Sequence, residues 1–227
     1  MESDRWYARS AGVFFLTAQI AGILSSVILL PIQDAPDYLA QFSANETQVL
    51  LGALFEFIMA AAAPGIAISL YPILKRQNEG MALWSVGFRI IEGALFMIGV
   101  FGILSLVPVS QEFVQAGSPS GSYFQTLGGI LLAGPAWVIG GIAFCLAALV
   151  YYYVFYQSEL VPRWLSVFGL IAITMGLAAN LLLFFSIGIP FEFSFLLQIP
   201  TLVQEVVFAV WLIVKGFDSP ANATGST

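Results

Sequence analysis

The amino-acid sequence predicts an all-α fold: one integral membrane bundle of six transmembrane helices, with short loops and with both termini in the cytoplasm. Composition is the first reason, because 59% of the 227 residues are hydrophobic and only 9% are charged, whereas soluble domains carry about 25% charged residues. The second reason is a series of six apolar runs, each offering the roughly 20 residues that a helix needs to cross the hydrocarbon core. The third is that nearly all the basic residues fall on one side of the predicted membrane.

The first predicted span, residues 11–31, follows Arg5 and Arg9. It has the position of a signal peptide, but its length and the lack of a small-x-small cleavage signature favour a helix that is retained. The loop after it, residues 32–46, holds three acidic residues and no basic residue. This loop is therefore expected on the outer side of the membrane.

Lys75 and Arg76 mark the next turn, between the predicted spans 47–74 and 83–107. Because basic residues concentrate in cytoplasmic loops, this turn sets the orientation of both helices. The segment 108–122 follows; it is rich in Gly, Ser and Pro and has a single charged residue, which is acidic. It is expected to be an outer loop.

The fourth predicted span, residues 125–154, belongs to an apolar stretch that is too long for the bilayer unless it tilts or bends at Pro135. The fifth and sixth spans are predicted at 163–187 and 193–214, and the small, polar tail 218–227 is expected to be disordered. Aromatic residues near the end of the fourth span are typical of an interfacial belt: Tyr151, Tyr152, Tyr153, Phe155 and Tyr156.

The basic residues give the topology. Six of the seven lie on one side of this arrangement: Arg5, Arg9, Lys75, Arg76, Arg163 and Lys215. The seventh, Arg89, lies within a span. Under the positive-inside rule this pattern places both termini in the cytoplasm of a multi-pass protein in the cell (plasma) membrane. Residues 1–217 are expected to form a single transmembrane domain.

Three segments carry a resemblance to a known family. They are LYPILKRQNEGMALWSVGFRIIEG at 70–93, LVPRWLSVFGLI at 160–171 and EVVFAVWLIVKGF at 205–217. Together they resemble the prokaryotic multi-pass membrane family known as domain of unknown function 4386. The resemblance implies a six-helix membrane architecture, and it brings no activity, substrate or catalytic residue.

Several classes of function are made unlikely by composition. A net charge of −6 with only seven basic residues argues against nucleic acid as a partner. The chain has no histidine, which removes imidazole metal sites and the Ser-His arrangement of serine hydrolases. Cys145 is the only cysteine and is expected to be a packing residue. We therefore expect no catalytic residue, cofactor or metal site; the expected partners are the lipid bilayer, a proton or small solute, and a second copy of the chain.

Four charged residues lie within the predicted spans, where an ionised side chain costs about 2.5–3.5 kcal/mol on insertion scales. They are Glu56, Arg89, Glu92 and Glu205. Arg89 and Glu92 are three residues apart and share a helix face, and the helix rise places Glu92 and Glu205 near the middle of the membrane. A single polar core is geometrically possible, with two amides as further members: Gln19 and Asn180.

The first interpretation of this polar core is structural. Arg89 neutralises Glu92 or Glu205, the remaining carboxyls are protonated, and the amides complete an interhelical hydrogen-bond network that holds together a membrane subunit or a partner-binding protein. The buried charges then serve only the fold.

Two functional interpretations stay open beside it. Three carboxylates against one guanidinium leave an excess of titratable groups, which favours a small-solute or proton-linked transporter or channel. Bends at Pro64-Gly65, Pro135 and Pro200 would give its helices room to move. An intramembrane enzyme that acts on lipid, with a Glu as general acid or base, is the remaining hypothesis. Transport is the first functional expectation, and an enzyme is not expected.

Overall fold

The computed structural model describes residues 2–119, 123–132, 136–185 and 191–218, and within them the chain forms eight α-helices. They are α1 (Glu2–Gln33), α2 (Tyr38–Ala44), α3 (Glu46–Leu74), α4 (Glu79–Gln115), α5 (Tyr123–Leu132), α6 (Ala136–Ser158), α7 (Arg163–Phe184) and α8 (Phe191–Val214). Six segments of the described chain are long and apolar enough to cross a membrane: Asp4–Gln33, Glu46–Leu74, Glu79–Gln115, Tyr123–Ser158, Arg163–Phe184 and Leu196–Val214. The predicted all-α, six-span architecture is confirmed.

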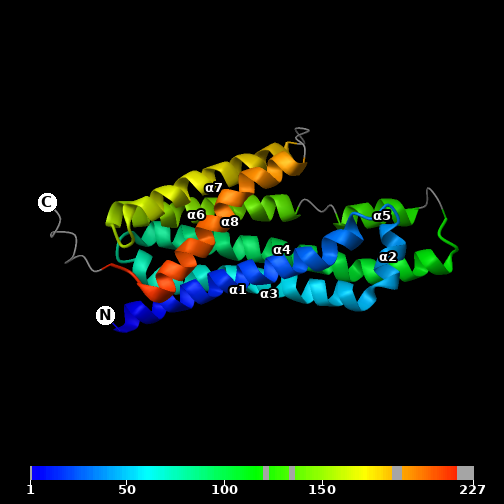
Figure 1. The fold of residues 1–227 in the computed structure, drawn as a ribbon, viewed down its shortest axis with the longest axis horizontal. Coiled ribbons are helices and arrows are strands. Elements are labelled where there is room, and N and C mark those ends of the chain that lie inside the picture. The colour runs from blue at the N-terminus through cyan, green and yellow to red at the C-terminus, as the bar shows by residue number, and fades with distance from the viewer. Residues whose placement is uncertain (1, 120–122, 133–135, 186–190, 219–227) are drawn as a thin grey trace.

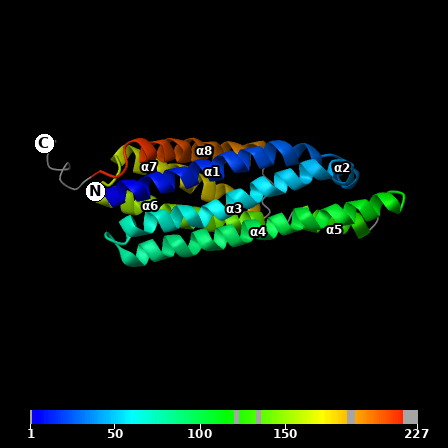
Figure 2. The ribbon, with the colours of Figure 1, turned by 90° about the horizontal axis from the view of Figure 1, so that it is seen from below.

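The long helices pack as a closed ring. Going round the bundle, α1 packs on α3, α3 on α4, α4 on α6, α6 on α7, α7 on α8, and α8 returns to α1. Figures 1 and 2 show these helices running side by side along the long axis of the molecule. Because each helix turns one face toward the ring interior, residues from helices distant in sequence meet there.

The two ends of the described chain lie at the same end of the bundle, as Figure 1 shows. Arg76, in the turn between α3 and α4, makes a two-pronged ion pair with Asp4 of α1 at 2.8 and 2.9 Å. The backbone N–H of Asp218 donates to the carbonyl of Leu160, between α6 and α7, at 2.8 Å. We call this the terminal end. The topology brings the six basic residues predicted to share one side to this end.

Local capping shapes the turns at the terminal end. The side chain of Asn78 accepts a hydrogen bond from the N–H of Met81 at 3.0 Å and so caps the start of α4. Pro162 stands immediately before α7, where its lack of an N–H is harmless. Glu159, at the end of α6, has a positive φ of 54° that stops the helix.

The opposite end, which we call the far end, departs from the sequence prediction. The segment 108–122 was expected to be an outer loop, but α4 continues through Pro108 to Gln115. At 37 residues, α4 is about 55 Å long, well beyond the roughly 30 Å hydrocarbon core. Its extension packs against α2, whose Leu39 and Phe42 are buried. The helix α2 lies within the segment 32–46, which was predicted as the first outer loop. Apolar contacts therefore continue the helix beyond the membrane span.

Some predicted features lie outside the described residues. These are the bend at Pro135, the end of the fifth span beyond Phe185, and the tail apart from Asp218. Pro64 and Pro200 lie inside α3 and α8, which continue past them.

Small residues let the helices approach closely. A Cβ atom added to Gly93 of α4 would lie 2.8 Å from the carbonyl oxygen of Ala60 in α3. One added to Gly12 of α1 would lie 2.7 Å from the carbonyl oxygen of Ala209 in α8. Such backbone contact is how membrane helices gain packing energy without a hydrophobic driving force. It also draws α3, α4, α1 and α8 around the polar residues of the interior.

Candidate functional site

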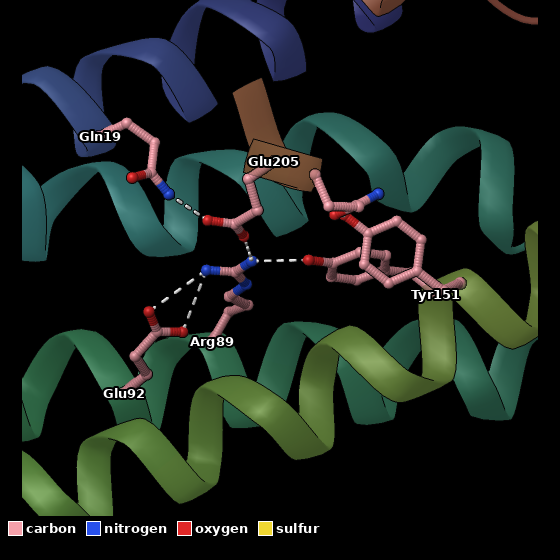
Figure 3. Close-up of polar contacts among 7 residues, drawn as sticks. Gln19, Arg89, Glu92, Tyr151 and Glu205 are labelled. Atoms are coloured by element: carbon pink, nitrogen blue, oxygen red, sulfur yellow. Dashed lines mark hydrogen bonds and ion pairs between the residues drawn. The ribbon is translucent and has the colours of Figure 1, made fainter. Parts of the chain in front are cut away.

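Five polar side chains meet inside the ring, and we call them the Arg89 cluster. They are Arg89 and Glu92 of α4, Tyr151 of α6, Glu205 of α8 and Gln19 of α1. Figure 3 shows the guanidinium of Arg89 between Glu92, Glu205 and Tyr151, with Gln19 reaching Glu205 from the other side. One residue in a single helix thus contacts three partners, two of them on other helices.

Helical spacing explains why the α4 residues face inward. Ala82, Ser85, Arg89 and Glu92 are all buried and follow one another at intervals of three or four residues. Residues at that spacing lie on one face of a helix. The same face continues at Gly93, where α3 approaches. The two charges therefore belong to the packing face of α4.

The guanidinium of Arg89 uses both terminal nitrogens. Nη1 donates to the two carboxylate oxygens of Glu92, each at 3.2 Å. Nη2 donates to the hydroxyl of Tyr151 at 2.8 Å and to Oε1 of Glu205 at 3.4 Å. The other oxygen of Glu205 accepts from the amide of Gln19. Glu205 consequently links α8 to both α4 and α1.

The cluster is removed from the protein surface. Arg89 is 3% exposed, Glu92 4% and Glu205 5%. Aromatic rings surround the guanidinium, with its carbon atom 4.8 Å from the ring centre of Phe144 and 5.6 Å from that of Phe15, which adds cation–π attraction. Two carboxylates share one guanidinium here. With both ionised the cluster carries a formal charge of −1, and one bound proton makes it neutral.

The structure joins four of the six residues proposed from the sequence and leaves two apart. Gln19, Arg89, Glu92 and Glu205 are connected by hydrogen bonds. The carboxylate of Glu56 instead accepts from the hydroxyl of Ser25 at 3.3 Å.

Asn180 also bonds outside the cluster. Its amide donates to the carbonyl of Gly176 in its own helix at 2.9 Å, and lies 4.0 Å from the sulfur of Cys145. Its amide oxygen lies where a Cβ on Gly141 would stand, so Asn180 packs α7 against α6. Its position is that of a helix-packing residue beside the cluster.

Tyr151 was missed by the sequence analysis, and the interfacial-belt interpretation of its segment is wrong for three of five residues. Tyr151, Tyr152 and Phe155 are fully buried, whereas Tyr153 and Tyr156 are each 41% exposed. The hydroxyl of Tyr152 donates to the amide oxygen of Gln204 at 2.6 Å. Residues 151, 152 and 155 are spaced as one face of a helix, and this spacing indicates burial. The interfacial-belt interpretation instead followed from the number of aromatic residues in the segment.

Replacing Tyr151 by phenylalanine is expected to lower the free energy of unfolding by about 1–3 kcal/mol, because the change leaves a buried, charged donor of Arg89 without its partner. Reversible unfolding in mixed detergent micelles measures the effect. The matched control is Tyr153→Phe in the same helix, at a position 41% exposed, which should change stability by less than about 0.5 kcal/mol. Equal effects of the two substitutions would contradict the role given to Tyr151.

The cluster has two carboxylates and one guanidinium, and the second carboxylate can bind a proton or a small cation. It can also couple that event to helix packing, since Glu92 lies on the same helix as Arg89 while Glu205 lies on α8. These are properties of charge number and connectivity.

Comparison with known proteins agrees with the resemblance noted in the sequence. No curated protein and no solved structure matches the chain. A family of proteins does match, over residues 10–216, and its description is "Domain of unknown function (DUF4386)". That match covers five of the six spans in full and the first from residue 10 onward, and it includes all residues of the Arg89 cluster. The chain belongs to this family of unknown function, as a membrane protein with six segments long and apolar enough to span the bilayer.

Proposed function

We propose that the protein is a small proton-linked transporter or channel-like protein, and that Glu92 and Glu205 around Arg89 form its proton-binding site. The observation that carries the proposal is the two-to-one ratio of carboxylates to guanidinium in a cluster no more than 5% exposed. An uncompensated charge in such surroundings is strongly disfavoured. A proton on one carboxylate removes that penalty, which makes proton uptake a natural event at this site.

Proton binding at Glu205 alters the contacts between helices. Arg89 then keeps its ion pair with Glu92 inside α4, while its ion pair with α8 is lost. Proton release restores the link between α4 and α8. Pro200 lies five residues before Glu205 inside α8 and removes a backbone hydrogen bond there. This gives α8 a place to bend when its charged contact changes, and Pro64 gives α3 another.

The proposal includes an orientation. The six basic residues other than Arg89 gather at the terminal end, and basic residues concentrate on the cytoplasmic side of membrane proteins. We place both termini in the cytoplasm, in the cell (plasma) membrane. The far end, with α2, α5 and the extension of α4, then faces outward.

Purified protein in liposomes tests the proposal. With a pH-sensitive dye inside, an imposed pH gradient and potassium with valinomycin to clamp the voltage, we expect the gradient to collapse faster than in protein-free liposomes. Candidate small cations and polar solutes added in turn should change that rate if transport is coupled. A rate equal to that of empty liposomes under every condition contradicts the proposal.

A structural or partner-binding subunit is the second candidate, and the hydrogen bonding of the cluster's carboxylates favours it. Every carboxylate oxygen of Glu92 and Glu205 has a partner. A polar network whose carboxylates are all hydrogen-bonded also serves to fix the register of packed helices. The two candidates differ in what neutral substitutions of the carboxylates do to flux.

A further inference from the structure

Buried polar atoms without a hydrogen-bond partner are unevenly distributed in the described part of the chain. Five belong to side chains that are at most 3% exposed: the hydroxyls of Ser85 and Ser166, the Nε of Arg89, the amide nitrogen of Gln204 and the carboxylate oxygen Oε1 of Glu56. The indole nitrogen of Trp211 is the sixth such atom in the described residues. Buried polar atoms are normally satisfied by protein or by ordered water, so these positions call for water.

Five of the six lie between the Arg89 cluster and the terminal end, or at the cluster itself; the sixth, Oε1 of Glu56, lies about 27 Å from the terminal end of α3, beyond the cluster. Counted from the terminal ends of their helices, Ser166 and Trp211 lie about 5 Å deep, Ser85 about 9 Å, and Arg89 and Gln204 about 15 Å. These five atoms thus form a series in depth that ends at the cluster.

Contacts join these positions across four helices. Ser85 and Arg89 are four residues apart on the buried face of α4. The hydroxyl of Tyr151 accepts from Arg89, and the next residue, Tyr152, bonds Gln204 of α8. The ring of Tyr152 also fills the space in front of Gly169 in α7, one turn after Ser166.

Buried serines of the far half contrast with these. The hydroxyl of Ser110 in α4 donates to the carbonyl of Val107 at 2.6 Å, and that of Ser25 in α1 bonds Glu56. Ser110 is fully buried, as are Ser85 and Ser166. Ser110 and Ser25 are therefore satisfied within the protein, whereas Ser85 and Ser166 are left unpaired.

We propose that a narrow pathway of buried water enters the bundle from the terminal end between α4, α6, α7 and α8 and reaches Arg89. Ser85, Ser166, Gln204 and Trp211 line it. Its role as the access route for the proton site rests on the proposed function; the presence of water does not. The pathway gives the cluster contact with one side of the membrane only.

Single cysteines test the pathway in the full chain in vesicles, with Cys145 replaced by serine. The variants are Ser85→Cys and Ser166→Cys, with Ser110→Cys as the buried control and Gln77→Cys, in the exposed turn after α3, to identify the side of the terminal end. A small cationic methanethiosulfonate reacts with a thiolate, which requires water around the sulfur.

We expect Ser85→Cys and Ser166→Cys to react at least about tenfold faster than Ser110→Cys, and only from the side on which Gln77→Cys reacts. If Ser85→Cys does not react with the reagent from either side while Gln77→Cys is labelled, the proposal is overturned, whether or not Ser166→Cys reacts. Equal labelling of Ser85→Cys from the opposite side also overturns it.

A second measurement uses the unsubstituted protein, so the test does not depend on the folding of a cysteine variant. In the unsubstituted protein, the indole N–H of Trp211 should exchange with deuterium rapidly, and exchange as slow as that of the bundle's backbone amides overturns the pathway. Neither measurement needs transport. Labelling without proton flux would therefore refute the proposed function and keep the pathway, and flux without labelling would do the reverse.

Discussion

Replacing Arg89 by methionine is expected to lower the free energy of unfolding by about 3–5 kcal/mol, the cost of removing one partner from a buried ion pair. The substitution leaves two carboxylates, Glu92 and Glu205, facing each other in a site at most 5% exposed. It also leaves the hydroxyl of Tyr151 without its donor. Reversible unfolding in mixed detergent micelles, followed by helical circular dichroism, measures the loss.

Two controls separate charge from size. Arg76→Met makes the same substitution in an ion pair whose Arg76 side chain is 51% exposed, and exposed pairs contribute no more than about 1 kcal/mol. Combining Arg89→Met with Glu92→Gln and Glu205→Gln removes the whole set of charges, and should recover most of the stability that Arg89→Met loses. If the triple variant is less stable than Arg89→Met alone, the electrostatic explanation is wrong.

Much of the fold was predictable because membrane spans depend on local composition. A run of apolar residues must become a helix in lipid, where the backbone has no other partner, and this rule located the helices. The rule says nothing about helices outside the hydrocarbon. Leu39 and Phe42 of α2 are buried, and α2 packs on the extension of α4. Helix α4 continues past Pro108. These are tertiary effects, which a hydropathy pattern does not contain.

The charged residues of the Arg89 cluster were predictable for a related reason. An ionised residue in a span must face a partner, so Arg89, Glu92 and Glu205 were identifiable from the sequence. Which residues meet depends on the order of helices around the ring. That order joins Gln19 of α1 to Glu205 and leaves Glu56 of α3 with Ser25. Tyr151 was hidden because its side chain could also have suited the membrane interface.

Replacing Glu205 by glutamine should reduce proton flux in liposomes by at least about tenfold, since a positioned titratable group is what speeds proton transfer. The fold should survive, because one carboxylate against one guanidinium leaves a neutral pair, Arg89 with Glu92. Glutamine keeps an oxygen that can accept from Arg89 or Gln19. The measurement is the rate of dye acidification under a clamped voltage, normalised to folded protein, with Glu112→Gln at the exposed end of α4 as the matched control.

The two candidate functions predict different combinations of flux and stability for this variant. A transporter with its proton site at Glu205 loses flux and keeps most of its stability, because the charge removed is the uncompensated one. A structural cluster has no flux to lose, and Glu205→Gln weakens only the contact that joins α8 to α4 and α1. Wild-type flux that Glu205→Gln and Glu92→Gln both leave unchanged would show that protons cross elsewhere. The charge excess around Arg89 would then belong to the fold alone.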